Sequence, residues 1–211
     1  MGGGITGKTG IPPPRFREHC GDMRKPNEQL HHDGVDLRRW RLEDAAVAFR
    51  VVTESLDHLA PWMPWARPDY DLKTATDFVS SSRSDWEQGK AFDYAVLEPG
   101  SDGSDVIGSA SLMARIGPGG LEIGYWLHRD HVGRGIVRRA ARALVDEAFR
   151  IGADHVEIVH DEANLRSRAV PEALGFTQVD RRNATDPPAP ACTGVQLVWR
   201  LAASEAVQRS S

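Results

Sequence analysis

The residues with the clearest chemical potential form a glycine-bearing turn, Val132-Gly133-Arg134-Gly135, and the start of the helix predicted to follow it. A helix that opens directly from a glycine turn offers free backbone N–H groups to an anion. Arginines crowd this start, at positions Arg134, Arg138, Arg139 and Arg142. The acidic residues Asp146 and Glu147 come later, which reverses the order that the helix dipole prefers. A multiply charged anion such as a polyphosphate would explain this order, and a solvated basic helix face is the alternative.

Two predicted strands flank this turn and its helix. Leu121–Leu127 alternates as a strand, Gly135–Arg150 has the pattern of an amphipathic helix, and His155–His160 reads as a second strand. A strand–helix–strand unit implies a parallel pair of strands with a right-handed crossover. The chain then continues into a short predicted helix, Asn164–Leu174.

The combined order and spacing of these residues resembles the GNAT acetyltransferase superfamily, in particular the RimJ/RimL-like branch that acetylates protein N-termini. The resembling residues are Glu122-Ile123-Gly124-Tyr125-Trp126-Leu127, Gly133-Arg134-Gly135, Asn164, Ser167 and Leu174-Gly175-Phe176. With weaker flanks, the resemblance extends over most of the chain, from Val35 to Leu201.

The resemblance implies acetyl-coenzyme A as the cosubstrate. In this family the glycine turn and helix start hold the pyrophosphate of acetyl-CoA, and the preceding strand aligns its pantetheine arm. The cofactor-binding positions implied in this way are Leu127, Val132, Gly133, Arg134, Gly135, Ile136, Val137, Arg138, Asn164 and Ser167.

The sequence departs from the family pattern at three positions. The turn usually reads Arg or Gln, two residues, Gly, one residue, and Gly or Ala, and these slots hold Val132, Gly135 and Val137 here. Val132 keeps the backbone N–H that a phosphate needs, whereas Val137 is expected to tighten the approach of the ligand. Many members carry a tyrosine four residues before the Gly-Phe pair, as the acid that protonates the departing thiolate. That slot holds Pro171, which has no proton to donate.

Acetyl transfer to an amine needs a positioned thioester, a neutral amine, a stabilised oxyanion and a proton for the leaving thiolate. Related enzymes place a base near the position of Glu122, so Glu122 is the candidate base, acting through water. An ordinary polar residue at a strand start is the alternative. The resemblance assigns Asn164 to the pantetheine arm and Ser167 to the sulfur, whose protonation it would assist; Asn164 also fits a helix N-cap. With Pro171 in the tyrosine slot, Ser167 or a water is the remaining proton donor, and Tyr125 is a weaker candidate with a place in the core as its alternative.

An aromatic, proline-bearing loop, Pro61-Trp62-Met63-Pro64-Trp65, is the candidate wall of the acceptor site. Its prolines stiffen it and its tryptophans offer apolar walls with N–H donors. The resemblance places this loop beside the acceptor cleft, so Trp62, Trp65 and Tyr125 are candidate substrate contacts. Core anchoring is the alternative for the tryptophans.

The modest base predicts the kind of acceptor. An α-amine, with a pKa of about 7.7–8.0, suits a weak base better than a lysine side chain at about 10.4. We therefore expect direct attack, in a ternary complex, by the N-terminal α-amine of a protein or peptide. The alternatives are a small-molecule amine, such as an antibiotic, and a non-catalytic acyl-CoA-binding sensor.

Composition argues against several other classes of protein. The net charge of −4 gives no reason to expect nucleic-acid binding, and the apolar runs are too short to span a membrane. The histidines show no zinc arrangement, so no metal is expected. Cys20 and Cys192 lack metal or redox spacing and indicate free thiols in a reducing compartment, the cytoplasm. The expected partners are acetyl-CoA and an amine acceptor, and the expected assembly is a monomer or homodimer.

The predicted organisation is one GNAT acetyltransferase domain, residues 34–202, between two tails. Residues 1–33 are rich in Gly, Pro and charge and are expected to be disordered, and residues 203–211 form a second tail. A P-loop match at Gly2–Thr9 lacks the flanking strand and helix, and an overlapping N-myristoylation match lacks a following amphipathic helix, so both are interpreted as chance. The predicted fold class is mixed α/β. Its central, mostly antiparallel twisted sheet is expected to have about six or seven strands, flanked by about four helices.

Overall fold

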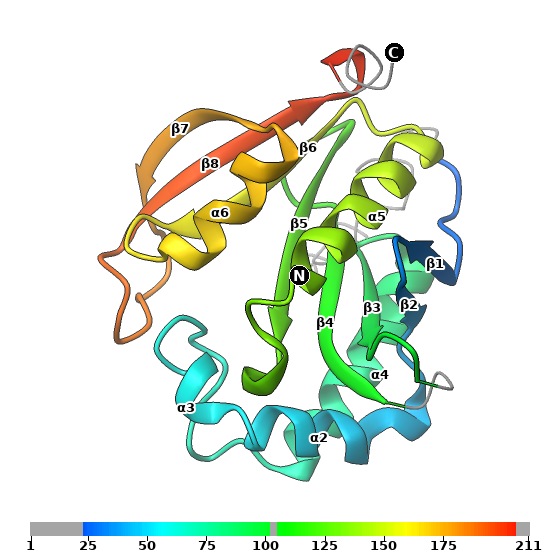
Figure 1. Cartoon of the computed structure of the whole chain (residues 1–211), viewed down its shortest axis with the longest axis vertical. Helices are drawn as coiled ribbons and strands as arrows, with labels where there is room; N and C mark the ends of the chain where they lie inside the picture. The colour runs from blue at the N-terminus through cyan, green and yellow to red at the C-terminus, as the bar shows by residue number, and fades with distance from the viewer. Residues whose placement is uncertain (1–22, 102–104, 206–211) are drawn as a thin grey trace, which may run out of the picture.

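A sheet of eight strands runs through the part of the chain that the structure describes, residues 23–101 and 105–205 of a computed structural model (Figure 1). The strands are β1 (Gln29–His32), β2 (Val35–Arg39), β3 (Ala91–Leu97), β4 (Val106–Met113), β5 (Gly120–Leu127), β6 (His155–Asp161), β7 (Thr177–Asn183) and β8 (Val195–Ala202). They lie in the order β1-β2-β3-β4-β5-β6-β8-β7, and only β5 and β6 pair in parallel. This confirms the predicted mixed, mostly antiparallel sheet, with more strands than the sequence indicated.

Helices cover both faces of the sheet (Figure 1). The described helical segments are η1 (Leu42–Asp44), α2 (Ala45–Thr53), α3 (Leu56–Leu59), α4 (Leu72–Gln88), η2 (Arg129–His131), α5 (Ile136–Ile151) and α6 (Leu165–Leu174). α5 packs on β1, β2, β4 and β5, whereas α2 and α4 pack together against β3 and β4 from the other face. α6 lies beside α5 and β6, so it adjoins the parallel pair of strands.

The amphipathic pattern of α5 explains its place on the sheet. Its buried side chains recur at helical spacing: Ile136, Ala140, Ala141, Leu144, Val145, Ala148 and Ile151. Gly135 precedes the helix at a φ of +71° and Gly152 follows it at +107°. Both values lie in the left-handed region that favours glycine. The predicted glycine turn and helix are therefore confirmed.

A second, smaller core positions the aromatic loop. On the face covered by α2 and α4, the buried side chains of Trp40, Ala48 and Val79 pack together. At the start of α4, the carboxylate of Asp71 accepts a hydrogen bond from the backbone N–H of Thr74 at 2.7 Å. The segment between α3 and α4, which carries Trp62 and Trp65, is thus held at both ends by packed helices.

The structured part of the chain begins before the predicted boundary at residue 34. β1 pairs with β2, from Gln29 opposite Arg38 to His32 opposite Val35, and Met23 is buried in the larger core with 8% exposure. The prediction of a disordered segment is therefore wrong for residues 23–33. β1 is an edge strand of four residues, and Leu30, which packs against the larger core, is its one apolar residue, so no apolar alternation marks the strand in the sequence. The P-loop and myristoylation matches and Cys20 lie outside the described residues.

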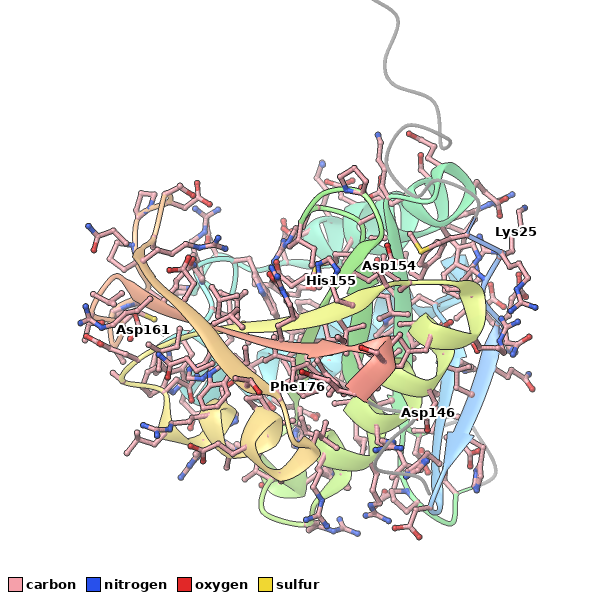
Figure 2. All side chains as sticks on the ribbon, turned by 90° about the horizontal axis from the view of Figure 1, so that it is seen from above. Lys25, Asp146, Asp154, His155, Asp161 and Phe176 are labelled. Carbon is pink, nitrogen blue, oxygen red and sulfur yellow. The ribbon has the colours of Figure 1, made fainter. Side chains whose placement is uncertain are left out.

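The parallel pair β5 and β6 separates part of the way along. Gly120–Ile123 pairs with His155–Ile158, and the pairing ends there although the strands continue to Leu127 and Asp161. β6 instead stays paired with β8 along its whole length. Seen from above, β6 runs from His155, beside the main sheet, outward to Asp161 (Figure 2). The sheet therefore opens between β5 and β6.

Candidate active site

A cleft of ≈ 610 Å³ lies where β5 and β6 part. Consecutive residues of both strands line it: Glu122–Trp126 from β5 and Ile158–Asp161 from β6. Because consecutive residues of a strand face opposite sides of a sheet, a cleft lined by such runs must pass through the gap between the strands. It therefore connects the two faces of the sheet.

Two loops form the outer walls of the cleft. The loop between α3 and α4 contributes Trp62 and Trp65, and the loop between β7 and β8 contributes Asp186, Cys192 and two prolines. The loops touch, since the backbone N–H of Ala191 donates to the carbonyl of Pro61 at 2.9 Å. The cleft is thus enclosed by segments that lie far apart in the sequence.

The aromatic side chains of the wall are accessible rather than buried in the core. Trp65 is 41% exposed and packs against Trp126 of β5, with ring centroids 5.8 Å apart. Trp65 also packs against Tyr70 at 6.2 Å. The predicted substrate contacts Trp62, Trp65 and Tyr125 all line this one cleft, and their contact with a substrate stays a prediction.

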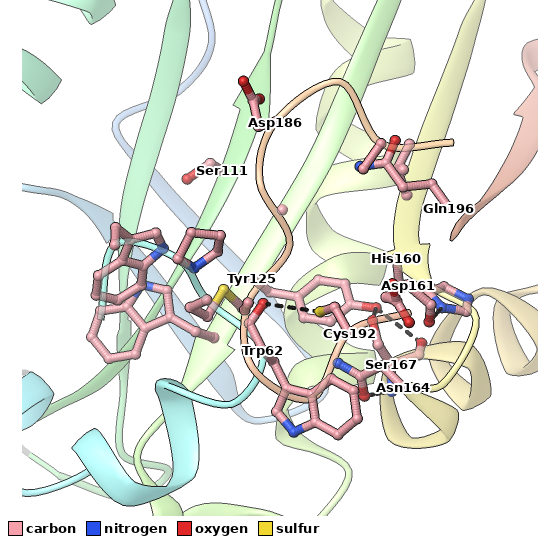
Figure 3. A pocket seen from close by; sticks show the side chains of 18 of the residues that line it. Trp62, Ser111, Tyr125, His160, Asp161, Asn164, Ser167, Asp186, Cys192 and Gln196 are labelled. Carbon is pink, nitrogen blue, oxygen red and sulfur yellow. Dashed lines mark hydrogen bonds between the residues drawn. The ribbon is translucent and has the colours of Figure 1, made fainter. Parts of the chain in front are cut away.

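A hydroxyl pair spans the gap between β5 and α6 (Figure 3). The Tyr125 Oη lies 3.1 Å from the Ser167 Oγ and 3.2 Å from the Ser167 backbone carbonyl oxygen. Burial raises the pKa of Tyr125 to about 12, so its hydroxyl stays protonated at neutral pH. The Asn164 side chain accepts from the backbone N–H of Ser167 at 3.1 Å and caps α6, as the sequence predicted for one of its two roles.

The candidate base Glu122 is held by an arginine that follows β4. Glu122 is 8% exposed, and Arg115 Nε donates to its Oε2 at 3.0 Å while Arg115 Nη2 donates to its Oε1. The hydrogen bonds to Glu122 raise the pKa of Arg115 despite the partial burial of the guanidinium. Both carboxylate oxygens of Glu122 are therefore engaged by one guanidinium.

The predicted phosphate-binding turn lies at the start of α5, outside the set of residues that line the cleft. Gly133 and Gly135 have φ values of +76° and +71°, and a Cβ at Gly133 would meet no atom within 4 Å. Arg139 braces the turn, since its guanidinium donates to the carbonyls of Asp33 at 2.8 Å and of Arg134 at 3.2 Å. The turn is thus open to a ligand at Gly133 and is held in place by the guanidinium of Arg139.

The other arginines near this turn differ in whether they form ion pairs. Arg142 pairs with Asp146 at 3.1 Å, one turn further along the helix, and Arg134 lies 3.6 Å from Glu98. Arg138 is exposed and forms no ion pair with any described residue. Some of the arginines near the helix start are therefore explained by ion pairs within the protein. Arg138 and the free backbone N–H groups are the groups left to bind an anion.

Several predicted cofactor positions offer only their backbone. The side chains of Leu127 and Ile136 are buried, and Val137 packs against the larger core. The bulk of Val137 is thus directed at least in part to the core, while Val132 is exposed. Pro171 is buried within α6, and its carbonyl accepts from the backbone N–H of Phe176 at 2.9 Å. It therefore helps to end the helix, and it has no proton to donate.

His160 and Asp161 also line the cleft, and neither is among the site residues predicted from the sequence. His160 Nδ1 donates to the Asp161 carbonyl at 2.8 Å and its Nε2 accepts from Trp199 Nε1 at 2.9 Å. Burial lowers the pKa of His160, so the ring is neutral and both nitrogens are occupied. The Asp161 carboxylate accepts from the backbone N–H groups of Thr193 and Gly194 at 3.1 and 2.9 Å. Asp161 therefore holds the end of the β7–β8 loop, and His160 is anchored to Trp199 of β8.

The contacts of His160 with Trp199 and of Asp161 with Thr193 and Gly194 join residues more than thirty positions apart, so no pattern local to the sequence predicts them. Among the described residues, no cluster of histidine, cysteine or acidic side chains is arranged to hold a metal ion. The described helices include none that is long and apolar enough to cross a membrane.

Comparison with known proteins identifies the family. The profile described as "Acetyltransferase (GNAT) domain" matches residues 35–177, more than half of the chain. The chain therefore belongs to the GNAT acetyltransferase family and is an N-acetyltransferase. Its relatives support the RimJ/RimL-like branch of that family.

One relative and two solved structures illustrate this similarity. A Bacillus subtilis (strain 168) protein, provisionally named ribosomal N-acetyltransferase YdaF, is 28% identical over 155 residues, which are 70% of this chain and 80% of that protein. The structure of RimL, a ribosomal L7/L12 alpha-N-protein acetyltransferase, in complex with coenzyme A has a TM-score of 0.75 at 18% identity and covers 84% of this chain and 99% of that chain. The structure of the microcin C7 self-immunity acetyltransferase MccE in complex with acetyl-CoA and AMP has a TM-score of 0.72 at 19% identity, with coverages of 88% and 98%. At these identities the two structures show a shared fold.

Proposed function

We propose that this N-acetyltransferase transfers the acetyl group of acetyl-CoA to the N-terminal α-amine of a protein or peptide. The observation that carries the proposal is the cleft between β5 and β6, which connects the two faces of the sheet. A thioester reaching through this gap would meet an amine held between Glu122 and the tryptophan-bearing wall. The names of the relatives support the acceptor class, since YdaF is named a ribosomal N-acetyltransferase and RimL an alpha-N-protein acetyltransferase.

The start of α5 fits the diphosphate of acetyl-CoA. The first N–H groups of a helix have no partner within the helix, and the two left-handed glycines let a ligand approach the backbone closely. Arg138 adds a positive charge that no described carboxylate neutralises. Asn164 and Ser167 line the cleft and would lie toward the pantetheine arm and the sulfur. Acetyl-CoA supplies the activated thioester.

Direct attack by the amine is the mechanism that fits the cleft. Cys192 is the one cysteine among the described residues, and burial raises the pKa of its thiol, with the nearby Asp161 charge adding to the effect. Such a thiol is not activated as a nucleophile. In the transfer, the amine nitrogen forms the C–N bond, the C–S bond breaks with its electron pair on sulfur, and the nitrogen gives up a proton through water to Glu122.

The pairing of Glu122 with Arg115 supports an α-amine as the acceptor. Arg115 donates to both carboxylate oxygens of Glu122 and occupies part of their accepting capacity, so this carboxylate suits an amine that needs little help to become neutral. Neutralising a lysine rather than an α-amine at pH 7 costs roughly 3.5 kcal/mol more, from the difference of about 2.5 pKa units. The base in this cleft is therefore matched to a protein N-terminus.

A peptide screen tests this acceptor. Pairs of peptides with a free or an acetyl-blocked N-terminus, each containing one lysine, are assayed for CoA release and for the acetylated position. Activity confined to the free N-termini is expected, and Trp65→Ala should raise the KM for the peptide far more than the KM for acetyl-CoA. Equal activity on the blocked peptides would identify lysine as the target and contradict the proposal.

A small-molecule amine is the second candidate acceptor. The cleft volume of ≈ 610 Å³ falls in the range of about 300–1,000 Å³ that is typical of small-molecule sites. The structural neighbour MccE was solved with acetyl-CoA and AMP, which shows that this fold also accommodates a small molecule besides the thioester. A panel of small amines in the same assay decides between the two, because a kcat/KM well above that of every peptide would favour this alternative.

A further inference from the structure

We propose that Tyr125 is a positioning residue that holds the Ser167 hydroxyl for donation of a hydrogen bond to the departing sulfur. This inference rests on the proposed acetyl transfer and adds a residue to its machinery. It starts from a hydroxyl pair that joins β5 to α6 across the cleft (Figure 3). In Figure 3 the Tyr125 side chain reaches from its strand toward Ser167 and Asn164.

The contacts of the Tyr125 hydroxyl allow two arrangements. The Ser167 carbonyl oxygen, 3.2 Å away, can only accept, whereas the Ser167 Oγ, 3.1 Å away, can donate or accept. In the first arrangement Tyr125 donates to the carbonyl and Ser167 donates to Tyr125. In the second, Ser167 turns its proton to another acceptor and Tyr125 donates to the Ser167 Oγ instead. A sulfur that gains negative charge favours the second arrangement.

The local fold holds both partners in place. Asn164 caps α6 and accepts from the Ser167 backbone N–H, which fixes the first turn of the helix that carries the serine. Tyr125 lies beyond Ile123, the last residue of β5 that pairs with β6, so its side chain can cross the gap. Pro171 lies one turn further along α6 and has no proton to donate. The strand thus supplies a phenol to a helix that lacks one at that slot.

The phenol supports the serine and is not itself the source of the proton. Burial raises the pKa of Tyr125 to about 12, so transfer of its proton to a thiolate, whose thiol is more acidic than this phenol, would be uphill. A hydroxyl that keeps its proton still orients and polarises Ser167. When the C–S bond breaks, its electron pair stays on sulfur, Ser167 donates a hydrogen bond to it, and the proton lost by the amine nitrogen returns to sulfur through solvent.

Kinetics of three variants test the inference. Tyr125→Phe is expected to lower kcat about tenfold with the KM for acetyl-CoA unchanged, because a donor in direct contact with developing charge contributes about 10²–10³ and Tyr125 acts on the sulfur only through Ser167. Ser167→Ala should lower kcat at least as far. The double variant should match Ser167→Ala, since Tyr125 acts only through the serine. A double variant that loses the product of the two factors, or a Tyr125→Phe variant with wild-type kcat, would overturn the proposal.

Tyr94→Phe is the matched control. Tyr94 is a buried tyrosine of β3 whose Oη donates to the Asn27 carbonyl at 2.8 Å, outside the cleft. The Tyr94→Phe variant should keep wild-type kcat. This result would show that the loss of a buried phenol hydroxyl does not by itself slow the reaction. A loss of kcat in Tyr94→Phe equal to that in Tyr125→Phe would mean that the effect is general destabilisation.

A binding measurement separates this inference from the proposed function. The thiol of bound CoA is titrated by its ultraviolet thiolate absorbance, which needs no acceptor amine. A hydrogen bond from Ser167 should give bound CoA a lower thiol pKa in the wild type than in Tyr125→Phe or Ser167→Ala. Equal thiol pKa values in all three would refute the role of Tyr125 even if acetyl transfer is demonstrated. The lower value in the wild type would uphold it even if the acceptor proves to be another amine.

Discussion

Replacing Gly135 with glutamate tests the proposed acetyl-CoA site at its most sensitive point. Gly135 has a φ of +71°, where an L side chain is strained by about 1–2 kcal/mol. A Cβ built there would meet only Arg138 Nη2, at 3.8 Å, so there is no steric clash beyond that strain. The new carboxylate would stand at the start of α5, where the diphosphate is proposed to bind. Gly135→Glu should therefore fold but fail to bind acetyl-CoA.

Thermal melting measures both effects in one assay. In a chain of this size 1 kcal/mol corresponds to about 2–4 °C, so the strain should lower the Tm of the unliganded variant by about 2–8 °C. For the wild type at a ligand concentration near 100 times Kd, binding adds about 2.7 kcal/mol, or about 5–11 °C. Gly135→Glu is expected to show none of this ligand-induced increase.

Gly117→Glu is the matched control for backbone strain. Gly117 has a φ of +99°, a Cβ there would meet no atom within 4 Å, and it precedes β5, at the opposite end of that strand from the glycine turn. It should lower the unliganded Tm to a similar extent and keep the full increase with acetyl-CoA. An increase in Gly135→Glu as large as that in Gly117→Glu would refute the assignment of the diphosphate to the start of α5.

Three further perturbations probe the base, the boundary of the domain and the stability of the cleft. Glu122→Gln should lower kcat more at pH 7 than at pH 9 with the KM for acetyl-CoA unchanged, because a base matters most while the amine is protonated; wild-type rates at both pH values would make Glu122 structural. Deletion of residues 1–33 should lower the Tm, because it removes Met23 and β1, whereas deletion of residues 1–22 should leave both the Tm and acetyl-CoA binding unchanged. Burial lowers the pKa of His160 below its usual 6.5, so the unfolded chain binds more protons and stability is lost as the pH falls below about 6.5. The Tm of His160→Gln should therefore vary less between pH 7 and pH 5 than that of the wild type, and equal slopes would contradict this account.

The parts of the fold that the sequence could predict are those determined by neighbouring residues. The glycine turn and α5 follow from a run of apolar positions at helical spacing after Gly135, and both were found within a residue or two of the prediction. The Asn164 cap is a local contact as well, three residues from its partner. Such features depend on the local backbone conformation, which residues within one short segment determine.

The features that the sequence could not predict depend on distant partners. β1 has no apolar pattern of its own and exists because β2 offers it backbone hydrogen bonds. The separation of β5 from β6 is invisible in either strand, because it follows from the way β6 stays with β8. Arg115 was not singled out because nothing in its flanking residues announces the pair with Glu122, and Tyr125 was rated a weak candidate because its partner lies 42 positions away.

Arg115 and the open sheet together suggest why this cleft would favour amines that are easily deprotonated. Glu122 is 8% exposed and lies beside the gap between β5 and β6, and Arg115 donates a hydrogen bond to each of its two carboxylate oxygens. Each oxygen thus has less accepting capacity left for the proton of a water or an amine. A lysine ammonium entering the cleft must lose its proton before it can attack, whereas an α-amine arrives partly neutral at the same pH. The acceptor preference that we propose therefore depends on the arginine beside the base as much as on the shape of the aromatic wall.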